Sequence, residues 1–600
     1  MATTHPRELC CSTWMLSLVD SQLTGRGICS ARRRKSIQMQ PSSGSARGRR
    51  FVLLTAASTA SAFADFNWTT IEPSTSLNWT ACYADGLDCA RLIVPLDYAS
   101  PNTSQTAALA LTRFRSTTPS SSYRGPILLN PGGPGGSGVG FAVVYGSEIA
   151  GIVGAEYDIV GFDPRGVSFS TPTISWFLND AERALWYPPN QNTVLPSVNE
   201  TALGLPYAYT RAQVQSQVAA GRDADVMQFM TTDYTAQDML SITEAFGFEK
   251  LKYWGVSYGT VLGQTFAALF PDKVERVVID GVLPVDDWYS ANLTETMLDT
   301  KQVLDAFFES CFEAGPSVCA FHNNASSPSD IATALDDLLS SIQQNPVPAV
   351  VSLSEGNAGY GVVDYSLVKN VIFQSLYQPY KEFPALAQAL ADLAAGNAST
   401  IYAASGAQEF TCAPGAAPVN KMFEAGASIT CTDVTPNDTL ADLQSYYAGM
   451  AAISEFADVW VPVRIACAGW KVHRPGQYTG PTGATNTSAP LLVIGNLRDP
   501  VTSWPGANET ANVLFPGSGF LTYNASGHTS FIAPSTCLYD HVSAYFRNGT
   551  LPPAGAVCQP DVQLFGTTNP TNASAADVSR RGVPGLTMGG TRLRKGLFSL

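Results

Sequence analysis

Short apolar runs rich in Val, Ile and Leu recur along two stretches of the chain, and each run ends at glycine or other turn-forming residues. Runs of about four to eight such residues, bounded by turn signals, are typical of buried strands. Residues 260–270 instead place apolar side chains at helical spacing and stop before Pro271. A strand, a helix and a strand in succession favour a parallel sheet with covering helices. The expected strands lie within 125–130, 155–162, 250–256, 273–282, 489–498 and 520–527.

The strand rhythm fades between about residues 288 and 485, where Ala, Leu, Gln and Ser dominate at helical spacing. We therefore expect an α/β protein with a mostly parallel central sheet and an inserted helical cap domain. The residues after 565 have the composition of an unstructured tail. The predicted parts are 1–64 (N-terminal extension and signal peptide, removed), 65–287 (first part of the core), 288–485 (helical cap or lid), 486–565 (second part of the core) and 566–600 (tail).

Composition and charge indicate a large globular body. With 45% hydrophobic and only 14% charged residues over 600 positions, the chain can bury a sizeable core. The first 50 residues hold nine Lys or Arg and two acids, so the remainder carries 26 basic and 47 acidic side chains, a formal charge of -21. Such a body should repel nucleic acid and anionic membranes, and we expect neither as a partner.

The N-terminal region predicts secretion. Residues 49–64 have two arginines, a short apolar segment and an A-x-A arrangement ending at Ala64, the features of a secretory signal cleaved near that residue. The signal lies deep in the chain, so we expect translation to start at Met39, with residues 1–38 an extension. N-x-S/T glycan acceptors also favour an extracellular protein. They are Asn67, Asn78, Asn102, Asn199, Asn292, Asn324, Asn397, Asn437, Asn486, Asn508, Asn524, Asn548 and Asn572.

Cysteine spacing predicts disulfides rather than a metal site. Of twelve cysteines, Cys10, Cys11 and Cys29 precede the cleavage site, which leaves nine in an oxidising compartment. No C-x-x-C or H-E-x-x-H spacing supports metal binding, and no metal or other cofactor is implied. The close pairs are Cys82 with Cys89, Cys311 with Cys319 and Cys537 with Cys558, while Cys412, Cys431 and Cys467 compete for one more bridge.

The stretch "YWGVSYGTVLG" places Ser257 between two glycines, directly after an expected strand and before an expected helix. That context is what a nucleophile elbow requires, because the serine must be exposed at the tip of a sharp strand-to-helix turn. Asp499 follows the strand "LLVIGNLR", and His528 follows "LTYNASG". The order Ser, Asp, His matches the α/β-hydrolase arrangement of nucleophile, acid and base. Imidazole activates the serine, and the carboxylate fixes the imidazole tautomer.

Acyl transfer also needs two backbone donors directed at the developing oxyanion. We expect one to be the amide of Tyr258, directly after the nucleophile. The other should come from the glycine-rich loop after residues 125–130, at Gly132 or Gly133. This loop lacks the G-K-[ST] ending of a phosphate-binding loop, so a nucleotide role is disfavoured.

Five short segments and the C-terminal cysteine region carry a resemblance to a known family; they are "NPGGPGGSG", "GFDPRGVSFS", "GVSYGTVLG", "NLRDPVT", "SGHTSF" and "STCLYDHVSAYFRNGTLPPAGAVC". Together they resemble the secreted tripeptidyl-aminopeptidase-like serine hydrolases, relatives of the prolyl iminopeptidases. The resemblance spans roughly residues 76 to 566 and implies an α/β-hydrolase core with a helical cap, exopeptidase action near the substrate's N-terminus, and Ser257, Asp499 and His528 as nucleophile, acid and base. After "DPVT" this chain departs from the family's usual proline with Ser503 and Trp504.

Alternatives remain for individual residues. Asp280, at the end of the strand after the elbow, is a rival acid, and His473 is a rival base. Asp163 and Arg165 could contact substrate, but a structural ion pair at the strand end is the stronger expectation.

Three functions compete. The first is a secreted serine aminopeptidase whose cap carboxylates hold the substrate's α-ammonium group, with Asp286, Asp287 and Glu295 as candidates. The second is a carboxylesterase that acts on small esters with the same triad, because fold and triad do not fix the acyl substrate. The third is a non-catalytic extracellular binding module on a hydrolase scaffold, which predicts a broken triad. The expected partner is thus a peptide or small-ester substrate, and the oligomeric state is open.

Overall fold

The computed structural model describes residues 66–101, 104–187, 201–353, 359–406, 421–434 and 437–566. Within them a ten-stranded sheet has the order β1-β2-β3-β5-β4-β6-β7-β10-β11-β12. The pairs among β1, β2, β3 and β5 are antiparallel, and every pair from β5 to β12 is parallel. The strands are β1 (Thr80–Ala81), β2 (Leu87–Pro95), β3 (Thr106–Phe114), β4 (Pro126–Asn130), β5 (Asp158–Phe162), β6 (Leu251–Val256), β7 (Val274–Asp280), β10 (Leu492–Arg498), β11 (Gly519–Ser526) and β12 (Val557–Cys558).

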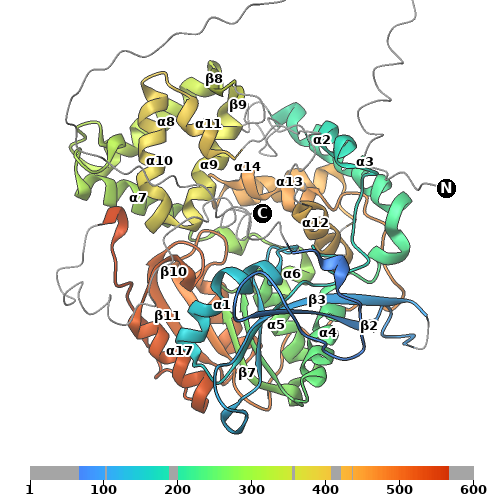
Figure 1. Cartoon of the computed structure of the whole chain (residues 1–600). Helices are drawn as coiled ribbons and strands as arrows, with labels where there is room; N and C mark the ends of the chain where they lie inside the picture. Colours follow the sequence, from blue (N-terminus) through green and yellow to red (C-terminus); the bar gives the residue numbers. More distant parts are fainter. Residues whose placement is uncertain are drawn as a thin grey trace, which may run out of the picture.

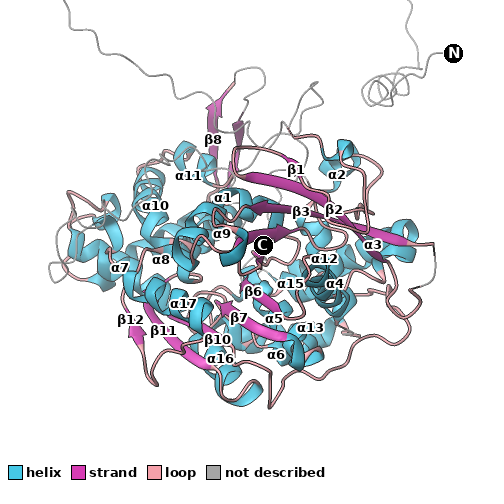
Figure 2. Cartoon of the chain, turned by 60° about the horizontal axis from the view of Figure 1, so that its bottom comes forward, coloured by secondary structure: helices cyan, strands magenta, loops and turns pink. Residues whose placement is uncertain are grey.

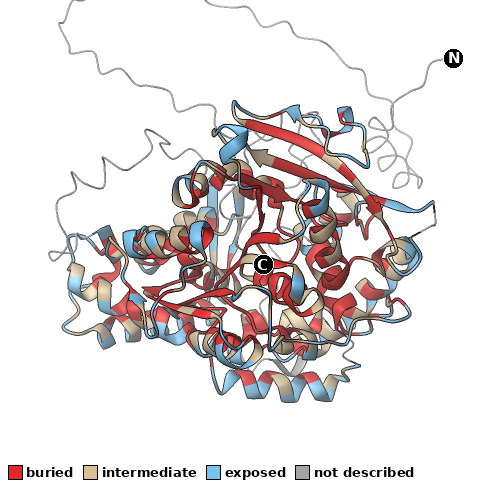
Figure 3. Ribbon diagram, turned by 90° about the horizontal axis from the view of Figure 1, so that it is seen from below, coloured by how far each residue is buried: buried red, intermediate tan, exposed pale blue. Residues whose placement is uncertain are grey.

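The central strands are buried on both faces. Every residue of β4, β5 and β6 is buried, which explains why these segments are continuous apolar runs and not alternating ones. Helices α1 (Gly138–Val153) and α17 (Thr536–Asn548) pack on one face of the sheet, and α4 (Thr232–Ala245) and α5 (Tyr258–Leu269) pack on the other. Figure 2 shows the strands between these helices, and Figure 3 shows the buried residues concentrated along the strands.

A second hydrophobic core lies in the helical part that joins β7 to β10. Figure 1 shows this part, coloured from green to orange, above the sheet. It contains an antiparallel hairpin of β8 (Val347–Ser352) and β9 (Gly359–Val363), so it is not purely helical. Its helices are α6 (Val285–Ser290), α7 (Thr300–Ala314), α8 (Pro328–Gln344), α9 (Tyr365–Tyr377), α10 (Pro379–Ala394), α11 (Ser399–Ala404), α12 (Met422–Asp433), α13 (Leu440–Ala451), α14 (Ala457–Trp460) and α15 (Pro462–Ile465).

The helical layer also draws on an earlier segment. Between β5 and β6 the chain forms α2 (Asp180–Trp186) and α3 (Thr201–Met227), and α3 contacts α12, α13 and α15. After β10, the short helix α16 (Trp504–Glu509) returns to the sheet. The predicted domain limits at 287 and 485 remain predictions, and the α3 contacts show that helices from both sides of the first limit pack together.

Four disulfides join described cysteines, and the three predicted close pairs are confirmed. The fourth bridge joins Cys431 at the end of α12 to Cys467. Cys412 and the expected signal segment 49–64 lie outside the described residues. Among the helices that are described, none has both the length and the apolar character needed to cross a membrane.

Candidate active site

Ser257 occupies the turn between β6 and α5, as the strand and helix patterns predict. Its backbone has φ 58° and ψ -128°, an unfavourable conformation for a residue with a side chain, and such strain is common at functional positions. Space beside the turn is tight, because a Cβ added at Gly259 would lie 2.6 Å from the carbonyl oxygen of Asn130. The Ser257 amide donates to the Asp280 carbonyl at 3.0 Å and so ties the elbow to β7.

Asp499 and His528 meet at the ends of two neighbouring parallel strands. Asp499 directly follows β10, and His528 comes two residues after β11. Both carboxylate oxygens of Asp499 lie 3.0 Å from Nδ1 of His528. The carboxylate also accepts backbone N–H groups from Val501, Thr502 and Thr529 at 2.9–3.0 Å. Asp499 is completely buried, so it is held rigidly in a position to orient the imidazole.

The loop that carries His528 is fixed from three sides. The side chain of Asn496 donates to the carbonyls of Gly527 and Thr529, both at 2.7 Å. The His528 amide donates to the carbonyl of Tyr377 at 2.9 Å, so the last residue of α9 holds this loop directly. The hydroxyl of Thr502 lies 3.2 Å from Nδ1 of His528. The ring therefore has a defined orientation.

The other imidazole nitrogen of His528 has no hydrogen-bond partner in the part of the chain that the structure describes. Nε2 of His528 is buried and makes no hydrogen bond to any described residue, Ser257 included. Hydrogen bonds between a nucleophile and its base are often long in enzymes without substrate and tighten in the complex. The structure thus joins the expected acid and base directly and leaves Nε2 available to a third group.

The rival acid Asp280 has different partners. Its carboxylate accepts the Ser530 amide at 2.9 Å, the Ser530 hydroxyl at 2.5 Å and the Trp254 indole N–H at 3.3 Å. Burial raises the pKa of Asp280 to about 6. Asp280 therefore braces the chain two residues beyond His528, whereas Asp499 reaches the imidazole.

The glycine-rich loop after β4 lies against the elbow. A Cβ added at Gly132 would lie 2.8 Å from the Tyr258 amide nitrogen and 2.9 Å from Cβ of Ser257. The Gly132 amide is already used, because it donates to the side chain of Asn130 at 2.9 Å. Among the described residues, the amides of Gly133 and Tyr258 have no such partner. Of the two predicted loop glycines, Gly133 is thus the one with a backbone donor to offer.

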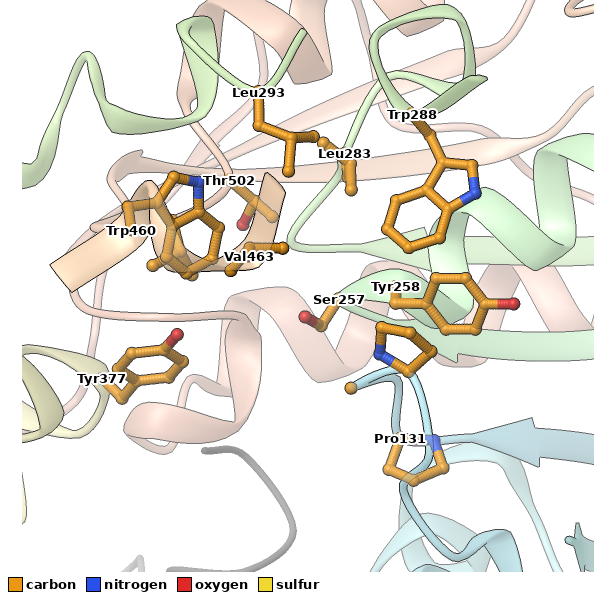
Figure 4. Close-up of a pocket in the computed structure, with 13 residues that line it drawn as sticks. Pro131, Ser257, Tyr258, Leu283, Trp288, Leu293, Tyr377, Trp460, Val463 and Thr502 are labelled. Atoms are coloured by element: carbon orange, nitrogen blue, oxygen red, sulfur yellow. The ribbon is translucent and has the colours of Figure 1, made fainter. Parts of the chain in front are cut away.

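A pocket opens beside Ser257 and is almost entirely apolar. Figure 4 shows Ser257 near its centre, with Pro131 and Tyr258 on one side and Tyr377 and Trp460 on the other. None of its lining residues carries a charge. The lining consists of Pro131, Gly133, Pro134, Ser257, Tyr258, Leu283, Trp288, Leu293, Tyr377, Trp460, Val463, Val501 and Thr502.

Helix α12 of the helical part packs directly on the glycine-rich loop. A Cβ added at Gly135 would lie 2.6 Å from the carbonyl oxygen of Met422, and one added at Gly426 would lie 2.5 Å from that of Pro134. The two backbones therefore touch. Between these two contacts on α12, the buried Glu424 pairs with Arg183 and accepts the Trp176 amide at 2.7 Å.

Asp433, at the end of α12, reaches toward the pocket wall. It accepts the Thr232 amide at 2.9 Å and the indole N–H of Trp288, a pocket residue, at 3.0 Å. Burial raises the pKa of Asp433 to about 7. Sequence reasoning missed this residue and the pocket residues Tyr377 and Trp460. Val501 and Thr502, by contrast, had a signal, because they belong to the "DPVT" segment that carries Asp499.

Other residues singled out from the sequence have structural partners. Arg165 is fully buried and pairs with Asp238 through two bonds of 2.6 and 2.7 Å. Asp163 accepts the Ser137 hydroxyl at 2.6 Å. Both residues are thus structural, but they do not pair with each other. His473 does not line the pocket, and burial lowers the pKa of its imidazole.

The expected ammonium-binding acids lie near the pocket residues Trp288 and Leu293 but are not part of its lining. Burial, with smaller contributions from Asp286, Glu295 and Glu509, raises the pKa of Asp287 to about 7. One oxygen of Asp287 is buried without a hydrogen-bond partner among the described residues. The chain therefore keeps a compact group of carboxylates beside the pocket.

The chain was compared with known proteins. The family described as TAP-like protein matches residues 452–558. Tripeptidyl aminopeptidase of Streptomyces lividans is 28% identical over 81% of this chain and 87% of its own length. Serine protease Hip1 of Mycobacterium bovis is 28% identical over 80% of this chain and 91% of its own length. Carboxylesterase B of Mycobacterium tuberculosis is 26% identical over 79% of this chain and 86% of its own length. With the observed sheet, these similarities indicate a serine hydrolase with the α/β-hydrolase fold that is similar to the tripeptidyl-aminopeptidase-like proteins.

Proposed function

We propose that the protein is an aminopeptidase that removes short peptides or single residues from polypeptide N-termini through an acyl-enzyme on Ser257. The observation that carries this proposal is the buried Asp499–His528 pair, at the same edge of the parallel sheet as the strained Ser257 at the end of β6. Two of the relatives are named as peptidases, which favours a peptide substrate.

In the proposed reaction, Nε2 of His528 takes the proton of the Ser257 hydroxyl while Oγ attacks the scissile carbonyl carbon. Asp499 holds the tautomer in which Nδ1 carries the proton, and it stabilises the imidazolium that forms. The amides of Tyr258 and Gly133 receive the developing oxyanion. His528 then returns the proton to the leaving amine, and a water molecule, activated by the same imidazole, hydrolyses the acyl-enzyme.

Substrate selection falls to the helical part, which we propose to be the cap at 288–485. A cap that covers the pocket limits access to chain ends and small molecules. The carboxylates of Asp286, Asp287 and Glu295 would hold the α-ammonium group of the substrate, because a hydrogen bond between an ammonium and a carboxylate is stronger than one between neutral groups.

The test is hydrolysis of three matched chromogenic amides, one with a single free amino acid, one with a free tripeptide and one with an N-acetylated tripeptide. The proteins are the mature enzyme and its Ser257→Ala variant. We expect cleavage of the free-amine substrates alone, and its loss in the variant. The substrate cleaved faster gives the length of the released unit. Cleavage of the acetylated peptide at an equal rate would contradict aminopeptidase action.

A carboxylesterase is the second candidate, favoured by the relative that carries that name. It predicts turnover of simple esters and of none of the amides. A non-catalytic binding module predicts no Ser257-dependent turnover of any substrate.

We further propose that the enzyme is secreted after cleavage near Ala64, an interpretation that the four disulfides support. Sequencing the N-terminus of the exported protein should give Asp65 as the first residue. A start well before residue 65 would contradict the proposed signal.

A further inference from the structure

Two polar groups in the apolar pocket have no partner. The hydroxyl of Tyr377 and the indole Nε1 of Trp460 are both buried, and neither makes a hydrogen bond to any described residue. The two side chains are 5% and 7% exposed, respectively, and both line the pocket that contains Ser257. Their position is fixed by packing, since both rings contact Phe373, with centroid distances of 5.7 and 6.0 Å.

Figure 4 shows these two rings on the side of the pocket opposite Tyr258 and Pro131. The Tyr377 ring also stands edge-on to the His528 imidazole, with centroids 5.2 Å apart. The unpartnered groups thus belong to the wall that adjoins the expected base, across from the glycine-rich loop that offers Gly133. A substrate acyl group bound to Ser257 would occupy the space between them.

The chemistry of the two groups restricts what can satisfy them. An indole N–H is only a donor, so Trp460 needs an acceptor on the ligand. The Tyr377 hydroxyl can also donate, and burial together with the nearby Asp499 carboxylate raises its pKa, which keeps the proton on the oxygen. Every other lining residue on this wall is apolar apart from Thr502. The wall therefore suits a ligand with apolar side chains and well-placed acceptor oxygens.

We propose that Trp460 and Tyr377 bind the backbone carbonyl oxygens of a peptide acyl group upstream of the scissile bond, so that the pocket selects peptides with apolar side chains over simple esters. This inference rests on the proposed function and specifies its substrate class. A buried donor left unpaired is costly, so a site built around donors discriminates against an analogue that lacks the matching oxygen. A simple aliphatic ester has no carbonyl upstream of the one that reacts, and it leaves both groups unpaired.

The test compares an apolar free tripeptidyl 4-nitroanilide with 4-nitrophenyl hexanoate, using wild type, Tyr377→Phe and Trp460→Phe. Phenylalanine keeps an aromatic ring and removes the polar atom. We expect the ratio of kcat/KM for the amide to that for the ester to fall about tenfold or more in each variant. Tyr447→Phe is the matched control, because Tyr447 is buried in α13 outside the pocket, and its ratio should equal that of wild type.

Two further substrates identify the oxygen that is bound. In each, sulfur, a weaker acceptor, replaces one of the two carbonyl oxygens upstream of the scissile bond. Wild type should cleave the analogue altered at the bound oxygen more slowly than the unaltered peptide. The variant that lacks the group binding that oxygen should cleave both substrates at nearly the same rate, as a double-mutant cycle requires.

The outcomes separate the two proposals. Suppose that wild type cleaves the tripeptidyl amide, but that in both variants the ratio of kcat/KM for the amide to that for the ester is unchanged, including the case in which both activities fall equally. The inference about Tyr377 and Trp460 is then wrong, and the proposed aminopeptidase function stands. If wild type cleaves only the ester, the proposed function itself is wrong, and this inference falls with it.

Discussion

Both carboxylate oxygens of Asp499 lie 3.0 Å from Nδ1 of His528, whereas the buried carboxylate of Asp280 accepts hydrogen bonds from the amide and the hydroxyl of Ser530. The two acids lie at the ends of adjacent parallel strands, β10 and β7, which pair through Ile494 and Asp280. The two carboxylates thus lie on neighbouring strands but contact different residues, His528 for Asp499 and Ser530 for Asp280.

This difference predicts different effects of neutralising each acid. Asp499→Asn presents an amide to the imidazole and favours the wrong tautomer, so we expect kcat to fall about 10⁴-fold. Asp280→Asn loosens the segment after His528 but leaves the imidazole with its acid, so kcat should fall no more than about tenfold. Steady-state kinetics on one substrate, with thermal melts to compare folding, decide the matter. An equal loss in both variants would contradict the assignment.

The contact between α12 and the glycine-rich loop predicts a catalytic effect for a residue of the helical part. In Gly426→Ala the new methyl group would lie 2.5 Å from the Pro134 carbonyl oxygen, so the loop that carries the Gly133 amide must move. Since loss of one oxyanion donor costs about 10²–10³ in kcat, we expect a decrease of about 10²-fold with little change in KM.

Gly449→Ala is the matched control for that substitution. Gly449 lies in α13, where an added methyl group meets no atom within 4 Å. Alanine is also the better helix former, so this variant should keep full activity and gain up to about 1 kcal/mol in stability. A rise in KM with unchanged kcat in Gly426→Ala would show that α12 acts on binding and not on the oxyanion loop.

Asp433 predicts a pH dependence of stability. Burial raises its pKa in the folded protein from 3.8 to about 7, so between these values the folded state binds a proton that the unfolded state does not. The contribution of this bound proton to the stability of the folded state is therefore fully present below about pH 4 and is lost as the pH rises through about 7. We expect the Tm of wild type to fall more steeply than that of Asp433→Asn between pH 5 and pH 8.

The control for this measurement is Asp336→Asn, which removes an exposed carboxylate on α8. Its Tm should follow wild type across the whole range. Parallel curves for wild type and Asp433→Asn would mean that Asp433 titrates at its ordinary pKa despite its burial.

The cysteine count predicts one reactive thiol. Eight of the nine cysteines after residue 64 are paired with one another, so in a chain cleaved near Ala64 the count leaves Cys412, which lies outside the described residues, as the ninth. Thiol titration of the denatured, unreduced mature enzyme should detect one thiol per chain, and the same titration of the Cys412→Ser variant should detect none. If wild type yields no thiol and runs as a dimer without reductant, Cys412 joins two chains.

Much of the fold was predictable because its signals are local. Strands buried on both faces read as continuous apolar runs, and β4, β5 and β6 lie where those runs predicted them. Asp499 and His528 were predictable because parallel strands end at the same edge of a sheet, so residues after β10 and β11 come together. The order Ser257, Asp499, His528 along the chain then made these three residues the candidate triad.

The remainder depends on contacts that no local pattern encodes. Tyr377 and Trp460 are the last residues of α9 and of the four-residue helix α14, and no motif in either sequence marks them as pocket residues. The choice between Gly132 and Gly133 required the position of the Asn130 side chain. The sequence favoured Asp499 over Asp280 from the order of the residues, but it could not show that the Asp280 carboxylate accepts the hydroxyl of Ser530.

The helical part contacts both loops of the candidate active site: α12 packs against the glycine-rich loop, and the Tyr377 carbonyl accepts the His528 amide. Such a part is not an accessory that could be exchanged or deleted to widen specificity. A chimaera carrying the helices of a relative would inherit a displaced oxyanion site and a displaced imidazole together with the new pocket. A substitution in the helical part that changes substrate preference can therefore also disturb the reaction. We expect such substitutions to be accompanied by compensating ones on the other side of these two contacts.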